Sequence, residues 1–77
     1  PSLLTINAGD TVSFQLGANH NAVEVSQATW NANDNTSNGG FAVGFGGGNV
    51  LFTTPGTYYY VCQPHAGQGM KGRVVVQ

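Results

Sequence analysis

Short segments in which apolar and polar residues alternate dominate this chain and restrict it to folds built from strands. In residues 11–16 (TVSFQL), the alternation places Val12, Phe14 and Leu16 on one side and polar residues on the other. Successive side chains of a β-strand point to opposite faces, so a period of two indicates a half-buried strand. No window shows the sustained helical period with caps that would indicate a helix.

Similar segments recur along the chain and are separated by turns that contain glycine, proline or aspartate. Short strands at regular spacing with such turns are typical of an all-β sandwich or barrel. At 77 residues the chain has no room for two cores, so we predict a single domain over residues 1–77. We predict strands over residues 3–7, 11–16, 22–26, 49–53, 57–62 and 72–77, with turns at 8–10 and 54–56.

The alternation is lost over residues 27–48, where Asn, Ser and Gly dominate. Within this segment we expect Trp30, Phe41 and Phe45 to be core anchors, because large aromatic side chains supply much apolar area. The run GFGGG (44–48) would suit a flexible linker, but its apolar neighbours predict a connection between two strands. The sequence assigns no further role to this segment.

The chain carries few charges, which narrows the classes of partner. Charged residues make up 6% of the chain and the formal net charge is −1. Such a chain cannot present the basic surface that nucleic-acid binding needs, so we expect no nucleic-acid partner. No apolar run reaches the ~18 residues of a membrane span, so we expect no transmembrane segment. The start lacks the regions of a signal peptide, and we expect a mature domain or one trimmed from a longer precursor.

Residues 62–70 (CQPHAGQGM) gather chemistry that is rare elsewhere in the chain. Cys62 and Met70 are the only cysteine and methionine, and His65 is one of two histidines. A single cysteine forbids an internal disulfide. Pro64 and the glycines allow the loop to bend, so that a thiolate, an imidazole and a thioether can meet one metal ion. This soft donor set suits copper better than zinc or calcium.

The other histidine, His20, lies in the loop before the predicted strand at residues 22–26. That loop can fall at the same end of a sandwich as the loop that follows Tyr60. His20, Cys62, His65 and Met70 would then form a trigonal site of two imidazoles and a thiolate with a weak axial thioether. This arrangement is that of a blue-copper electron-transfer site.

Other kinds of function fit the same residues less well. Cys62 and His65 as a catalytic thiol–imidazole pair lie close in sequence and have no evident orienting acid, so we predict that the chain is not an enzyme. A copper buffer or chaperone stays open, although the Met-rich or C-x-x-C loops typical of that class are absent. A metal-free adhesive β-sandwich explains the strands but not the loop.

Several motifs together resemble one family of proteins. The C-x-P-H-x₄-G-M-x-G pattern of residues 62–72 is similar to the copper loop of the plastocyanin and pseudoazurin branch of the cupredoxins, which are type 1 blue copper proteins. The strand GTYYYVC (56–62), the segment AGDTVSF (8–14) and the pair His20-Asn21 also resemble that branch. The resemblance covers residues 3–26 and 49–77. It implies a Greek-key β-sandwich whose first strand is absent or reduced to Pro1-Ser2.

The resemblance also implies a role for each ligand of a single copper ion. Cys62 would be the thiolate ligand and His20 a buried imidazole ligand. His65 would be the ligand whose ring edge reaches the surface, where electrons enter and leave. Met70 would be the long axial ligand that helps to tune the potential.

Two neighbours of the ligands are expected to support them. Asn21 would donate its backbone N–H to the Cys62 sulfur, and its side chain would tie the two ligand loops together. Pro64 has no N–H and cannot supply a second such bond. Groups of this kind orient ligands and tune the metal.

The function implied is one-electron transfer by copper that cycles between Cu(II) and Cu(I). We expect a monomer that docks redox protein partners near His65. Family analogy places it in the periplasm or outside the cell. A copper-binding module of a larger redox protein is the remaining alternative.

Overall fold

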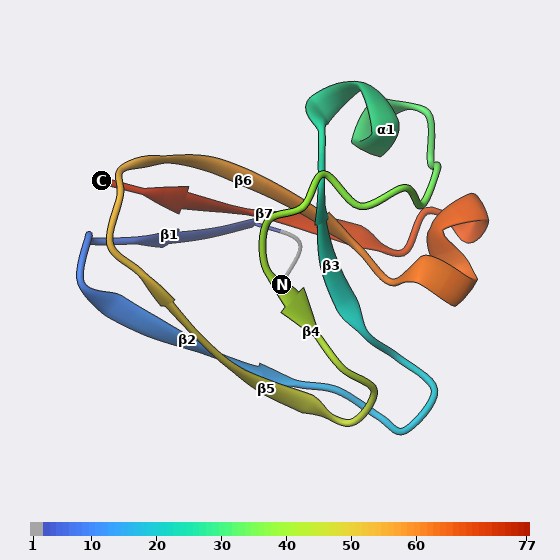
Figure 1. Cartoon of the computed structure of the whole chain (residues 1–77), viewed down its shortest axis with the longest axis horizontal. Helices are drawn as coiled ribbons and strands as arrows, with labels where there is room; N and C mark the ends of the chain where they lie inside the picture. The colour runs from blue at the N-terminus through green and yellow to red at the C-terminus, as the bar shows by residue number, and fades with distance from the viewer. Residues whose placement is uncertain (1–2) are drawn as a thin grey trace.

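The computed structural model describes residues 3–77 as two β-sheets that pack face to face (Figure 1). The larger sheet has the strand order β1-β7-β6-β3-β4, and the smaller sheet pairs β2 with β5. This architecture confirms the prediction of an all-β sandwich. The elements are β1 (Leu3–Ile6), β2 (Asp10–Gln15), β3 (Ala22–Val25), α1 (Gln27–Asn31), β4 (Ala42–Val43), β5 (Gly47–Phe52), β6 (Gly56–Val61), the 3-10 helix η1 (Gln63–Gln68) and β7 (Lys71–Val76).

The main core lies between the sheets and follows from the alternation in the strands. On β2, Phe14 is buried and Val12 packs against the same core, as does Leu16 just after the strand, as the pattern predicted. Opposite them, the ring of Tyr60 on β6 meets Phe14 edge-on, with 5.3 Å between ring centroids. The buried members of this cluster are Phe14, Ala22, Val43, Phe52, Val74 and Val76.

A second, smaller cluster lies on the outer face of the larger sheet. Val25 and Val61 are buried there, with Ala66 from η1, and Trp30 and Tyr59 pack over them. The short helix α1 follows β3 and lies outside the larger sheet (Figure 1), where Trp30 packs on Tyr59 with ring centroids 5.0 Å apart. The larger sheet is therefore covered on both faces near the end of β6.

The segment 27–48 departs from the expectations in three ways. It contains α1, although no helix was predicted, and Ser26 begins this helix by accepting a hydrogen bond from the Thr29 N–H at 3.1 Å. It also contributes the short strand β4, which pairs with β3. Phe45 is 58% exposed, so its prediction as a core anchor is wrong, whereas Trp30 and Phe41 pack against the cores as expected.

Phe45 is exposed because it sits in the tight connection between β4 and β5, which the run GFGGG forms as predicted. Gly46 and Gly47 have φ of +94° and +102°, a region that favours glycine. At Gly47 a Cβ would lie 2.2 Å from the carbonyl oxygen of Phe14. The backbone of β5 therefore approaches β2 more closely than a side chain would allow.

One side of the sandwich is less closed than the other. Between β1 and β2 lies a cavity of about 190 Å³, lined by Leu4, Val12, Phe14, Leu16, Tyr60 and Val74 among others. The prediction of a reduced first strand falls on Pro1-Ser2, which lies outside the described residues. Among residues 3–77, no helix has the length and apolar character needed to cross a membrane.

Candidate metal centre

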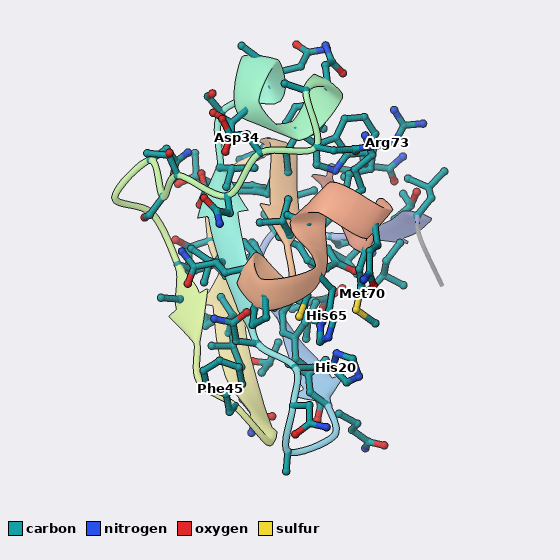
Figure 2. All side chains as sticks on the ribbon, turned by 90° about the vertical axis from the view of Figure 1, so that its right-hand side faces the viewer. His20, Asp34, Phe45, His65, Met70 and Arg73 are labelled. Atoms are coloured by element: carbon teal, nitrogen blue, oxygen red, sulfur yellow. The ribbon has the colours of Figure 1, made fainter. Side chains whose placement is uncertain are left out.

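Three predicted ligands meet at one end of the sandwich. The Sγ atom of Cys62 lies 3.5 Å from Nδ1 of His20 and 3.3 Å from Nδ1 of His65. The imidazole rings lie 4.9 Å apart at 50° to one another. All three donor atoms lie within 4.8 Å of one another, close enough to bind one ion. Figure 2 shows His20 and His65 pointing toward each other from separate loops.

The loop between β6 and β7 is bent by the residues that the sequence singled out. Pro64 stands in the first turn of η1, and the His65 N–H donates to the Cys62 carbonyl at 3.0 Å. Gly69 ends the helix in the left-handed region with φ of +81°. The chain then returns, and the Cys62 N–H donates to the carbonyl of Met70 at 2.9 Å. This fold of the loop brings His65 and Met70 back beside the end of β6.

The loop that carries His20 is held by a turn and by a neighbouring loop. The His20 N–H donates to the carbonyl of Gly17 at 3.1 Å. The N–H of Gly46, in the β4–β5 connection, points to the carbonyls of both Gly17 and His20 at 3.3 Å. The segment that the sequence left unassigned therefore supports one ligand loop.

Met70 lies at the edge of the same site. Its side chain is 43% exposed and borders a pocket of about 310 Å³. The pocket is lined by Leu16, His20, Asn21, Tyr60, Cys62, Met70 and Lys71. Met70 thus lines the same pocket as two of the three donors, His20 and Cys62, and its role as axial ligand stays a prediction.

Asn21 ties the two ligand loops together, as expected, and does so through a residue that sequence reasoning missed. The Gln63 N–H donates to Asn21 Oδ1 at 2.8 Å, and Asn21 Nδ2 donates to Gln63 Oε1 at 3.1 Å. The Gln63 amide also donates to the carbonyl of Asn35 at 3.1 Å. A bond from the Asn21 N–H to the Cys62 sulfur stays a prediction, since the sulfur contacts described are those with the two imidazoles.

The cysteine side chain is more buried than the two histidine side chains. Cys62 is 4% exposed and Asn21 is 8% exposed. His20 and His65 are both half-buried, so the expected contrast between a buried His20 and a His65 whose ring edge reaches the surface stays a prediction.

The donor set fits a single copper ion. Two imidazole nitrogens and one cysteine sulfur are borderline to soft donors, which suit copper. Within residues 3–77, His20, Cys62 and His65 are the only group of His, Cys, Asp or Glu side chains placed to bind one ion. Carboxylates, which hard cations prefer, are not part of this group.

Comparison with known proteins identifies the class. A family model described as copper binding proteins, plastocyanin/azurin family, matches residues 1–77. Together with the sandwich and its histidine–cysteine–histidine group, this match defines a cupredoxin with a site for one copper ion. The chain belongs to the plastocyanin/azurin family.

Individual relatives agree with this assignment. The plastocyanin of Prochlorothrix hollandica is 36% identical over 80 residues, covering 100% of this chain and 61% of that protein. The plastocyanin of Scenedesmus fuscus is 38% identical over 82 residues, covering 100% of this chain and 84% of that protein. Pseudoazurin of Methylobacterium extorquens AM1 has a TM-score of 0.74 at 28% identity, over 99% of this chain and 59% of that one. The chain therefore spans only part of the length of these proteins.

Proposed function

We propose that this chain carries single electrons through one type 1 copper ion held by His20, Cys62, His65 and Met70. The observation that supports this most directly is the approach of both Nδ1 atoms to the Cys62 sulfur, at 3.5 and 3.3 Å. When bound, the copper supplies the redox chemistry by alternating between Cu(II) and Cu(I). The proposal includes that the chain is an electron carrier and not an enzyme.

The protein contributes a preformed and rigid set of donors. His65 and Cys62 are fixed by backbone hydrogen bonds within the loop, and His20 is fixed by the turn at Gly17. The Asn21–Gln63 pair holds the two loops at a constant separation. Ligands that are held before the metal changes charge need little rearrangement, which favours fast electron transfer.

Electrons would enter and leave at His65. Its imidazole is half-buried and stands between the exposed residues Pro64 and Gly67, while Gly17 and Ala18 are exposed on the other ligand loop. These small, uncharged residues suit close contact with a redox protein partner. We further propose that the protein is a monomer and works in the periplasm or outside the cell, as the cupredoxin class suggests.

The test is the colour of the copper-loaded protein. Adding Cu(II) should give an intense blue absorption band, which ascorbate removes and ferricyanide restores. Cys62→Ser should abolish the band, whereas Gln68→Ala, an exposed position on the 3-10 helix that follows Cys62, should leave it unchanged. A colourless wild-type protein, or a band that survives Cys62→Ser, would overturn the proposal.

A further inference from the structure

The two cationic side chains of the chain converge on one tryptophan. The Nζ atom of Lys71 lies 4.2 Å from the centroid of the Trp30 ring, and the Arg73 guanidinium carbon lies 5.9 Å from it. Lys71 and Arg73 are two positions apart on β7 and so share the face of the larger sheet on which Trp30 packs against Tyr59, the cross-strand neighbour of Arg73. The chain's entire positive side-chain charge is therefore concentrated at one place.

A hollow accompanies these cations. It has a volume of about 330 Å³ and is lined by Leu3, Trp30, Gly69, Lys71 and Arg73. We call this the Trp30 pocket. Leu3 and the indole supply apolar surface, while the two cations supply charge beside it. A site of this composition suits a carboxylate side chain whose methylene groups contact the apolar part.

Hydrogen bonds hold Trp30 in place in the pocket, and the two cations keep hydrogen-bond donors that a ligand can use. The Trp30 indole N–H donates to the carbonyl of Gly72 at 3.0 Å, and Lys71 Nζ donates to the carbonyl of Trp30 at 2.7 Å. An ammonium group has three donors, so Lys71 keeps two for a ligand. The Arg73 side chain is exposed, and within the described part of the chain its guanidinium makes no hydrogen bond.

The acidic side chains of the chain are engaged elsewhere. Asp10 accepts a hydrogen bond from the Asn7 N–H in the β1–β2 turn. Glu24 accepts from Asn38 and from the Phe41 N–H, and Asp34 accepts from the Asn35 N–H. The positive charge at the Trp30 pocket is thus available to a partner.

We propose that the Trp30 pocket is a docking surface for an acidic protein partner, one of whose carboxylates pairs with Arg73 and Lys71 over the Trp30 ring. The Trp30 pocket lies next to the loop that carries the predicted copper ligands. Gly69 lines the pocket and Lys71 directly follows Met70, so a partner seated there contacts the end of the ligand loop. That this partner is a redox protein rests on the proposed function; the binding of acidic groups does not.

The experiment uses the Cu(I)-loaded protein, which is diamagnetic, and an acetylated hexaglutamate peptide as the probe. Titration followed by nuclear magnetic resonance should shift the Trp30 indole N–H and the amides of Lys71 and Arg73 together. Hexaglutamine should cause no such shifts. Raising salt from about 20 mM to about 200 mM should weaken peptide binding several-fold, because exposed charges are screened.

Two variants distinguish peptide binding at the Trp30 pocket from a general effect of the protein's net charge. Arg73→Gln should weaken hexaglutamate binding about tenfold, since a charge-assisted hydrogen bond is lost. Thr53→Asp makes the same change in net charge in the exposed turn after β5, at the opposite end of the sandwich, and should leave binding within about twofold of the wild type.

Three outcomes would overturn the proposal: shifts confined to the His65 loop, equal binding of hexaglutamine, or equal losses in the two variants. A protein that turns blue with Cu(II) but does not bind the peptide would refute this proposal and leave the proposed function standing. A protein that binds the peptide but gives no blue band with Cu(II) would refute the proposed function and leave this proposal standing.

Discussion

Gln63 connects three separate segments at the metal centre. Its backbone and side chain form two hydrogen bonds with Asn21 in one ligand loop, and its amide reaches the carbonyl of Asn35 in the segment after α1. Cys62 and His65 flank it within three positions. A side chain in this position controls how the two ligand loops face each other.

We therefore expect Gln63→Ala to alter the copper site as well as the stability. Two side-chain hydrogen bonds are lost and Nδ2 of the buried Asn21 is left without its acceptor, while Oδ1 keeps the bond from the backbone N–H at position 63; this should cost about 1–3 kcal/mol in the free energy of unfolding. The reduction potential and the copper hyperfine coupling should shift with it. Gln68→Ala, on the same helix but exposed, is the matched control. A loss of stability with an unchanged potential would show that Gln63 is only structural.

Tyr60 carries a prediction about alkaline pH. Burial raises the pKa of Tyr60 above its ordinary value of 10.0. The unfolded chain loses this proton near pH 10, whereas the folded protein keeps it to higher pH. Rising pH above that value therefore favours the unfolded state. Urea unfolding should show a steeper loss of stability above pH 10 for the wild type than for Tyr60→Phe. Parallel pH profiles would contradict the assignment.

Among individual residues, those with distinctive chemistry could be predicted and those with local partners could not. His20, Cys62 and His65 stand out because His and Cys are scarce in this chain, and the structure brings them together. Gln63 is a common residue whose partner Asn35 lies in a segment without periodicity. No sequence signal indicated that contact. Met70 as axial ligand remains a prediction.

At the level of elements, the β4–β5 connection depends on one glycine. Gly47 begins β5 with φ of +102°, and a Cβ there would lie 2.2 Å from the Phe14 carbonyl oxygen. Gly47→Ala should therefore lower the free energy of unfolding by more than about 2 kcal/mol, through backbone strain and displacement of β2. Gly44→Ala is the control, since φ is ordinary and no atom lies within 4 Å. Equal stability of the two variants in denaturant titrations would contradict this.

The strands could be predicted from alternation because each long strand buries one face. β2 and β7 show this directly, and their observed bounds differ from the predicted ones by a single residue at each end. The helix α1 spans five residues and β4 spans two. Neither is long enough to establish a period, and both depend on tertiary contacts, such as the packing of Trp30 on Tyr59.

For the whole molecule, metal binding should contribute to stability. The donors come from two loops that are distant in sequence, between β2 and β3 and between β6 and β7, so an ion bound to both joins the two halves of the chain. A ligand that binds only the folded state at a hundredfold excess over its Kd adds about 2.7 kcal/mol. Calorimetry should show a higher Tm with copper. Cys62→Ser should lose this increase, and an equal Tm with and without copper would contradict the prediction.

The fold class could be predicted because strand period, turn residues and the metal motif all indicated the same sandwich. The pairing order of the strands depends on contacts between distant segments, and local pattern carries little information about it. The cavity between β1 and β2 is likewise a feature that local pattern could not predict, since Leu4 and Val12 line it from strands of different sheets. That residues 1–77 form a single domain also remains a prediction.

The parallel pairing of β1 with β7 has a consequence for folding kinetics. Leu3 lies beside Arg73, so residues from opposite ends of the described chain must meet before the larger sheet is complete. A high contact order of this kind is typical of β-sandwiches that fold in milliseconds to seconds, because a long loop must close before the pairing gives any stabilisation. During synthesis, β1 lacks its β7 partner until β7 has left the ribosome, and until then its unpaired edge is open to mispairing.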